Sequence, residues 1–506
     1  MPPKRNVLLI VIDQLRADCL SGALAAVTPL PHLRALMAEA VSFERHYSVV
    51  NPCGPSRASI LTGQYAMNHR AIRNGTPLAH DTPNIATESR KAGYLPLLYG
   101  YTDSAQDPRS YDPRDPALTS YEEVMPGFHE EVEMRLEKSL PWRADLLSKG
   151  YDVPEYPDIF RPGGTELDGP ALYRAEDSDT AFLTDQFLRG LLGRPGGWFA
   201  HLTYIRPHPP LVAPAPYNRL VVRGDIPAPT TIGNAAFEAA QHPFLPFAQA
   251  KTPISAVVEG FPDLEPTDEN IATLRAVYFG LAAEVDHHIG RVIAALKAAG
   301  IYDDTLLVVT ADHGEMLGDH HLWGKSSFYD AAFHTPLIIR DPAAKAGHGR
   351  RVDAPTESID ITPTILRWLG RVPPDTMDGR DLTPFLENET PDQWREFTFS
   401  ELEFGEPIAP TAAQAGLGLS PEQANLAILR GPTHTLVHFN AGLPPMLFDH
   451  RSDGEARNVA ADGDQQSHLL AMSRAMLDHR MTHAGGRFGR TSITQSGARV
   501  AAKHQN

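Results

Sequence analysis

Cysteine is scarce in this chain of 506 residues, which contains only Cys19 and Cys53. Two cysteines cannot form a disulfide framework, so the fold must depend on a hydrophobic core. Apolar residues make up 42% of the sequence, which is enough material for such a core. At roughly 150 residues per structural unit, the length predicts two or more units.

Long hydrophobic runs are also missing. No apolar stretch approaches the roughly 20 residues that are needed to span a bilayer. The run at residues 7–12 follows Lys4 and Arg5 but stops at Asp13, which makes it shorter than the apolar part of a secretory signal. We therefore expect a soluble, cytoplasmic protein that does not bind membranes.

Positive charge is in deficit, because 45 Lys and Arg face 62 Asp and Glu, for a formal net charge of −17. A nucleic-acid-binding protein needs a basic surface, so we expect no nucleic-acid partner. An anionic substrate would have to be attracted by a local field, because the overall field repels it.

The sequence does contain short β-branched runs that alternate with helical patterns. Apolar residues recur at helical spacing in residues 31–43, 178–192 and 267–299. Strands buried on both faces of a parallel sheet are predicted at residues 6–12, 94–99, 198–205, 305–310 and 335–340. This alternation predicts an α/β fold with a large, mostly parallel central sheet flanked by helices.

The pattern changes near residue 373. Short strands at 397–404, 426–430, 433–439 and 446–448, with a helix at 465–481, are typical of a small antiparallel sheet. We predict a catalytic α/β domain (1–372), a C-terminal α+β subdomain with an antiparallel sheet (373–484) and a polar tail (485–506). The tail is either disordered or an arm used in oligomerisation.

Two stretches, 103–177 and 210–266, are rich in proline and show little periodicity. Loops of that length are uncommon in compact domains unless they are functional. We expect both to shape the mouth of the site.

Residues 51–63 predict a tight turn that enters a short helix. Pro55 suits the first helical position because it lacks an N–H group, and Gly63 suits a left-handed cap. Cys53 would then lie at the positive end of the helix, which favours anions. Asp13 and Asp312 each follow a predicted strand, and the carboxyl ends of such strands carry the sites of open α/β sheets.

The string Cys53-Gly54-Pro55-Ser56-Arg57, followed by Leu61-Thr62-Gly63, resembles the signature of the sulfatase family in the alkaline phosphatase superfamily. The resemblance covers about residues 6–481 and is greatest to the branch of arylsulfatases and phosphonate monoester hydrolases. It implies an alkaline-phosphatase-like fold. Other motifs of the family occur in the expected order, namely Asp13-Gln14, Arg73-Asn74, Arg206-Pro207-His208-Pro209-Pro210, Asp312-His313-Gly314-Glu315 and Gly324-Lys325.

The resemblance implies that a formylglycine-generating enzyme oxidises Cys53 to formylglycine (3-oxoalanine). The aldehyde hydrates to a diol, and one diol oxygen, held by a metal, attacks sulfur or phosphorus. The ester then collapses when the second hydroxyl loses its proton, which divides one difficult hydrolysis into two easier steps.

The resemblance also implies one divalent metal ion, with ligands from Asp13, Gln14, Cys53, Asp312 and His313. The commoner sulfatase wording has Asp-Asp at the first motif and Asp-Asn at the second. Gln14 removes one negative charge, and His313 replaces an amide oxygen with an imidazole nitrogen. Both changes favour manganese or zinc-like ions over calcium. Manganese is the first candidate, and calcium, magnesium and zinc are the alternatives.

Three further residues are implied to act in catalysis with the converted cysteine. Arg57 lies one helical turn beyond Cys53 and can steady the diol. His208 and Lys325 match positions that bind the anion or protonate the leaving oxygen. Either a neutral His208 donor or an imidazolium would serve.

Asn74, Tyr101 and Asp103 are the predicted substrate-binding residues. Ser56 keeps the sulfatase form where the phosphonate hydrolases have alanine. Asp103 stands where that branch has a hydroxyl residue, and a carboxylate there would repel an anion unless it is paired or protonated. Both differences favour sulfate esters over phosphonate esters.

Three hypotheses follow. The first is an arylsulfatase with promiscuous hydrolysis of phosphonate monoesters and phosphodiesters. The second is primarily a phosphonate monoester hydrolase or phosphodiesterase. The third, a catalytically silent binding protein, is disfavoured because Cys53, Asp13, Asp312 and His313 are intact. The partners would be a small-molecule ester and further copies of the chain, in a homodimer or homotetramer.

Overall fold

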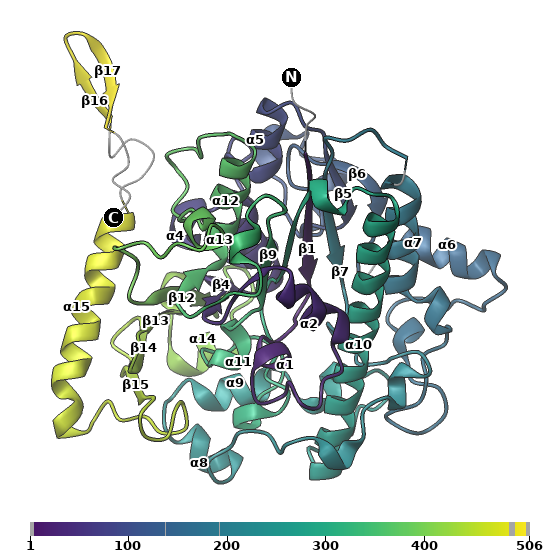
Figure 1. The fold of residues 1–506 in the computed structure, drawn as a ribbon. Helices are drawn as coiled ribbons and strands as arrows, with labels where there is room; N and C mark the ends of the chain where they lie inside the picture. Colours follow the sequence, from purple (N-terminus) through teal and green to yellow (C-terminus); the bar gives the residue numbers. More distant parts are fainter. Residues whose placement is uncertain (1–4, 137, 192, 485–490, 502–506) are drawn as a thin grey trace.

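The computed structural model describes residues 5–136, 138–191, 193–484 and 491–501. Its frame is an eight-stranded sheet with the order β10-β2-β9-β8-β1-β7-β5-β6 (Figure 1). The strands are β1 (Asn6–Ile12), β2 (Val41–Phe43), β5 (Pro96–Gly100), β6 (His129–Glu133), β7 (Phe199–Tyr204), β8 (Thr305–Ala311), β9 (Leu337–Arg340) and β10 (Arg351–Val352).

The sheet is mostly parallel, as predicted. Strand β1 pairs in parallel with β7 and β8, and β5 pairs in parallel with β7 and β6. Only β9 runs against its neighbours β8 and β2 among the described strands of this sheet. All seven residues of β1 are buried, which explains its unbroken run of aliphatic side chains.

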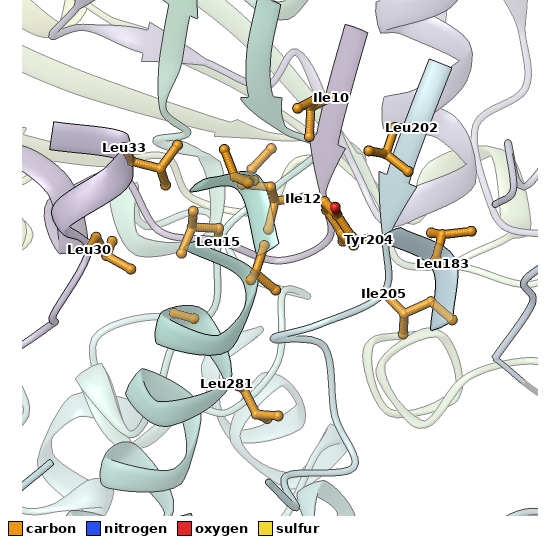
Figure 2. Packing of buried hydrophobic residues seen from close by; sticks show 14 of the residues in the cluster. Ile10, Ile12, Leu15, Leu30, Leu33, Leu183, Leu202, Tyr204, Ile205 and Leu281 are labelled. Carbon is orange, nitrogen blue, oxygen red and sulfur yellow. The ribbon is translucent and has the colours of Figure 1, made fainter. Parts of the chain in front are cut away.

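Helices cover both faces of this sheet. Leu8, Ile10 and Ile12 of β1 face a layer that contains α2 (Pro31–Ala38), α7 (Asp179–Leu191) and α10 (Asp268–Ala298). Figure 2 shows Leu33 and Leu281 in this packed layer. The opposite face of β1 packs with α3 (Cys53–Thr62), α5 (Ile85–Lys91), α12 (Ile361–Trp368) and α13 (Thr383–Leu386). The helix predicted at 31–43 ends at Ala38, because the β-forming residues 41–43 join the sheet as β2.

A second, five-stranded sheet has the order β15-β14-β13-β12-β4. Its C-terminal strands are antiparallel, as predicted, and Gly431-Pro432 forms the turn between β13 and β14. Helix α15 (Gln466–His483) packs against it through Met476. The strands are β4 (Val50–Asn51), β12 (Thr398–Glu403), β13 (Asn425–Arg430), β14 (His434–Phe439) and β15 (Met446–Asp449).

Strand β4 ends two residues before Cys53 and pairs in parallel with β12. Helix α3 therefore packs on the central sheet while the strand just before it belongs to the second sheet. The division into a catalytic domain (1–372), a C-terminal subdomain (373–484) and a tail (485–506) stays a prediction.

The stretch 103–177 has more regular structure than its sequence indicated. It contains β6, which forms an edge of the central sheet, and α6 (Leu140–Ser148). The sequence of β6 is His-Glu-Glu-Val-Glu, and each of its residues is exposed or half-buried, as is typical of a charged edge strand. The stretch 210–266 contains α8 (Ala235–Ala239) and α9 (Leu245–Lys251).

The remaining elements are short. In Figure 1 the hairpin of β16 (Thr491–Thr494) and β17 (Gly497–Val500) extends away from the body of the molecule. Residues 485–490 and 502–506 of the predicted tail lie outside the described residues. Among the helices described, none combines the length and the apolar character that crossing a bilayer requires. Six more elements are the helices α1 (Asp18–Ser21), α4 (Ala66–His69), α11 (Asp330–Phe333) and α14 (Ala412–Leu417) and the paired strands β3 (His46–Tyr47) and β11 (Thr356–Glu357).

Candidate active site

Four neighbouring parallel strands, β8, β1, β7 and β5, end at the same edge of the central sheet. Asp13 directly follows β1, Asp312 directly follows β8 and Tyr101 directly follows β5. The segment after β7 carries Arg206 and His208. Segments far apart in the sequence are thereby brought to one edge, where α/β sheets place their sites.

Helix α3 brings Cys53 to this edge. Cys53 is the first residue of the helix and Pro55 is the third. The prediction that Pro55 takes the first helical position was therefore wrong. Proline fits there because the N–H groups of a first helical turn have no acceptor within the helix. Gly63 ends the helix in the left-handed region (φ +65°), as expected. All ten residues of α3 are buried.

The ligand atoms of Asp13, Cys53, Asp312 and His313 lie within 4.8 Å of one another. His313 Nδ1 lies 3.0 Å from the carbonyl oxygen of Gly314 and must donate to it, which leaves the Nε2 lone pair free. That Nε2 atom lies 3.1 Å from the Sγ atom of Cys53.

The donor set fits a divalent cation. Asp13 Oδ1 is buried and accepts no hydrogen bond from the described residues, while Asp312 Oδ2 is buried and forms an ion pair with Arg57 rather than a hydrogen bond. Burial and the neighbouring Asp13 raise the pKa of Asp312 to about 6. Burial, with Asp13, also raises the pKa of the Cys53 thiol well above its ordinary value. Two carboxylates, a sulfur and an imidazole nitrogen would all gain from a cation between them.

Arg57 lies under these groups as a buried counter-charge. Its Nη2 atom is 3.1 Å from Asp13 Oδ2 and 3.0 Å from Asp312 Oδ2. Nη1 donates to Thr203 Oγ1 at 2.6 Å, and the guanidinium lies 4.1 Å from the centre of the Tyr101 ring. Arg57 therefore holds the two carboxylates in place.

Tyr101 belongs to the same support. Its hydroxyl donates to Asp13 Oδ2 and accepts from Arg57 Nη2. Asp103, in the left-handed region (φ +48°), lies 3.7 Å from Arg57 Nε. Burial raises the pKa of Asp103 to about 8, although Arg57 acts in the opposite direction. Asn74 accepts the N–H of Gly54 at 3.0 Å, one residue beyond Cys53.

Lys325 and His208 form a second group at the same edge. The Lys325 ammonium donates to His208 Nε2 at 2.7 Å and to Gln14 Oε1 at 2.8 Å. Arg206 donates to the carbonyl oxygens of His208 (2.8 Å) and Pro210 (3.1 Å), and its Nε atom pairs with Asp179 at 2.9 Å. This buried arginine fixes the loop that carries His208.

Two supporting residues were not predicted from the sequence. Thr203 precedes the end of β7, and only the folded chain shows that it accepts from Arg57. Glu315 contacts Gln14 through its carboxylate. The only indication of Glu315 in the sequence was its place in the motif Asp312-His313-Gly314-Glu315. Ser56, which was expected to distinguish substrates, donates to the backbone carbonyl of Asp312 at 2.6 Å.

The fold and the site define a hydrolase of the alkaline phosphatase superfamily. The model of the sulfatase family matches residues 5–371, and the chain belongs to that family. It is similar in structure to the phosphonate monoester hydrolase SpPMH from Silicibacter pomeroyi, with 60% identity, a TM-score of 0.96 and coverage of 98% of this chain and 99% of that one.

Two other relatives extend over nearly the whole chain. The phosphonate monoester hydrolase of Agrobacterium radiobacter is 40% identical, with a TM-score of 0.94 and coverage of 99% of this chain and 100% of that one. The multifunctional alkaline phosphatase superfamily protein PehA from Trinickia caryophylli is 38% identical over 503 residues, which cover 95% of this chain and 96% of that protein.

Proposed function

We propose that this protein hydrolyses small monoanionic esters, phosphonate monoesters and phosphodiesters first and sulfate monoesters second, with Cys53 in its formylglycine form as the nucleophile. The convergence of Asp13, Cys53, Asp312 and His313 within 4.8 Å carries the proposal. The order of substrates follows the relatives that share 60% and 40% identity.

The sequence favoured sulfate esters because of Ser56 and Asp103. The Ser56 hydroxyl is engaged by the Asp312 carbonyl, so it gives no reason to prefer sulfate. Asp103 lies beside Arg57, and its raised pKa reduces the repulsion of an anion. A sulfate monoester and a phosphonate monoester carry the same charge, so we expect both to be substrates.

Asp13, Asp312, His313 and Cys53 would hold the divalent cation. Gln14 as a further ligand stays a prediction from the sequence, and its side-chain oxygen accepts a hydrogen bond from Lys325 at 2.8 Å. When bound, such a cation lowers the pKa of the nucleophile and neutralises the non-bridging oxygens of the ester. Manganese remains the first candidate because the set includes an imidazole nitrogen.

The protein's own residues would divide the remaining work. Lys325, whose ammonium donates to His208 Nε2 at 2.7 Å, would deliver a proton to the leaving oxygen, and His208 would hold that ammonium in place. Asn74 orients the first turn of α3 through the N–H of Gly54. Arg57 and Tyr101 keep Asp13 ionised and fixed.

The test is the relative turnover of a nitrophenyl phenylphosphonate and a nitrophenyl sulfate by protein that was co-expressed with a formylglycine-generating enzyme. We expect both to be hydrolysed, the phosphonate with the higher kcat/KM. A higher value for the sulfate would support the arylsulfatase hypothesis.

Mass analysis of the Cys53 peptide should show the aldehyde, and Cys53→Ala should fold normally without turnover. An unmodified thiol with no turnover would favour a silent binding protein.

We also propose that the chain forms a homodimer or homotetramer. Leu470, Leu477 and Met481 are exposed along α15, and Ile493 is 82% exposed on the C-terminal hairpin. An isolated two-stranded hairpin is marginally stable in water, so a second subunit would stabilise it. Analytical ultracentrifugation of the full chain and of a chain ending at residue 484 tests this. The cytoplasmic location stays a prediction, to be tested by cell fractionation.

A further inference from the structure

Glu315 is a buried carboxylate (1% exposed) that neither the metal ligands nor the proposed proton donors include. Its Oε1 atom accepts the backbone N–H groups of Gly324 (2.6 Å) and Leu317 (3.1 Å). Its Oε2 atom accepts the side-chain amide of Gln14. One side chain thus joins the loop that leads to Lys325 with the residue that follows Asp13.

Gln14 has little freedom at its backbone. It lies in the left-handed region (φ +68°), which side-chain-bearing residues adopt rarely. Its N–H donates to Asp312 Oδ1 at 3.0 Å, and its carbonyl accepts the Tyr278 hydroxyl at 2.7 Å. What remains to be fixed is which end of the side-chain amide points to which neighbour.

The neighbours decide that orientation. The Lys325 ammonium, 2.8 Å from the amide, only donates hydrogen bonds, so it requires the oxygen end. The NH₂ end then needs an acceptor, and the carboxylate of Glu315 supplies it. If the amide were reversed, its NH₂ group would face the ammonium and its oxygen would face the carboxylate, which would leave both contacts repulsive.

We propose that Glu315 is a positioning residue that sets the orientation of the Gln14 amide and thereby holds the Lys325 ammonium beside His208. The proposal rests on the proposed function for the role of Lys325 in protonating the leaving oxygen. Lys325 Nζ also donates to His208 Nε2 at 2.7 Å and forms a hydrogen bond with Cys53, so Gln14 is one of the acceptors that fix its position. Losing the Gln14 acceptor would release the ammonium from one side.

A purely structural role for Glu315 would lie in its contacts with Gly324 and Leu317. The substitution Glu315→Gln separates the two roles, because a glutamine oxygen can still accept those two N–H groups. Its NH₂ group, however, faces Gln14, which must then turn its own oxygen toward position 315. The Gln14 NH₂ group would consequently face Lys325, donor against donor.

The experiment is an exchange of charge between the two positions. Gln14→Glu alone sets two carboxylates against each other. In Gln14→Glu combined with Glu315→Gln, the carboxylate at position 14 accepts from both the new amide and Lys325. We measure kcat for phenylphosphonate esters with a good (nitrophenyl) and a poor (phenyl) leaving group, the melting temperature and the bound metal per chain for the wild type and all three variants.

We expect Glu315→Gln to lower kcat for the poor leaving group by about tenfold and for the good one by less than about threefold, because one charge-assisted hydrogen bond is lost. The double variant should have a higher kcat for the poor leaving group than the worse single variant. Asp319→Asn is the matched control, since Asp319 anchors the same loop through Arg16 at 2.8 Å. It should lower the melting temperature without changing the dependence on the leaving group.

Equal losses for both leaving groups in Glu315→Gln, or a double variant no better than the worse single variant, would overturn the proposal. If Glu315→Gln does not fold, the comparison of Gln14→Glu with the double variant decides the question.

Lys325→Ala separates this inference from the proposed function. If that variant keeps full activity on the poor leaving group, the role proposed for Lys325 is wrong and the inference falls with it. If it loses activity while the exchange shows no recovery, only the inference is wrong.

Discussion

The Nε2 atom of His208 lies 2.7 Å from the ammonium nitrogen of Lys325. The other ring nitrogen, Nδ1, lies 2.5 Å from the carbonyl oxygen of Pro209 and must carry the hydrogen of a neutral imidazole. Burial, together with the charge of Lys325, lowers the pKa of His208 to about 3. Of the two forms considered from the sequence, the neutral ring is favoured, and its Nε2 atom accepts a hydrogen bond from the Lys325 ammonium.

The first prediction concerns this pair. His208→Ala should lower kcat by about 10²-fold for esters with poor leaving groups, since His208 holds the Lys325 ammonium that would donate the proton, and proton delivery typically contributes a factor of that order or more. The loss should shrink as the leaving group becomes more acidic. Steady-state kinetics over a series of substituted phenyl esters measures this dependence. A uniform loss across the series would indicate a binding role for His208 instead.

The second prediction concerns Arg57. Arg57→Met should lower the free energy of unfolding by about 3–5 kcal/mol, because Asp13 and Asp312 would stay buried without their counter-charge. Denaturant unfolding in the presence of a chelator measures the change, and Arg57→Lys is the control that keeps the charge. If Arg57→Met were as stable as the wild type, the support that we infer for the carboxylates would be wrong.

The third prediction concerns metal removal. Chelation should abolish turnover and lower the melting temperature, and manganese should restore both. At an ion concentration of 100 times Kd, binding stabilises the native state by about 2.7 kcal/mol. Asp13→Ala should be less sensitive to the added ion, because it lacks one ligand. Identical melting curves with and without the ion in the wild-type protein would contradict a site at these residues.

The fourth prediction concerns pH. Glu284 on α10 is fully buried, and burial, with the nearby Asp179, raises its pKa from the ordinary 4.5 to about 8. Between these two values the unfolded chain has lost the proton that the native chain keeps. The contribution of Glu284 to stability is therefore complete below pH 4.5 and is lost as the pH rises toward 8.

Glu284→Gln removes this titration. Relative to the wild type, the variant should become more stable as the pH rises, by at most about 1.4 kcal/mol per pH unit. Urea unfolding at several pH values between 5 and 8.5 measures the difference. A difference that does not change with pH would show that Glu284 ionises normally in the native protein.

The strands and the sheet edge were predictable from local sequence. The run at residues 6–12 is aliphatic over its whole length because both faces of β1 are covered, and that pattern needs no knowledge of the fold. The same reasoning predicted that Asp13 and Asp312 lie at the carboxyl ends of their strands, where the site is found. Strand direction was not predictable, since the antiparallel β9 is mostly aliphatic, as is the parallel strand β1.

The supporting contacts were not predictable for a different reason. Tyr101 was expected to bind substrate, and that role is untested. Its hydroxyl forms hydrogen bonds with Asp13 and Arg57, which belong to other elements of the fold. Edge strand β6 was missed because its charged residues show no buried face. Such features depend on residues distant in sequence, which a local pattern does not record.

Strand β4 connects an N-terminal segment of the chain to the C-terminal sheet. Its pairing with β12 holds the backbone just before Cys53, and Asn51 Nδ2 donates to the carbonyl oxygens of Ala332 (3.0 Å) and Lys325 (3.3 Å). A gene product that stopped near residue 372 would lack the partner of this strand, however intact its central sheet. Supplying the C-terminal part as a separate chain should therefore restore the strand pairing that aligns the nucleophile.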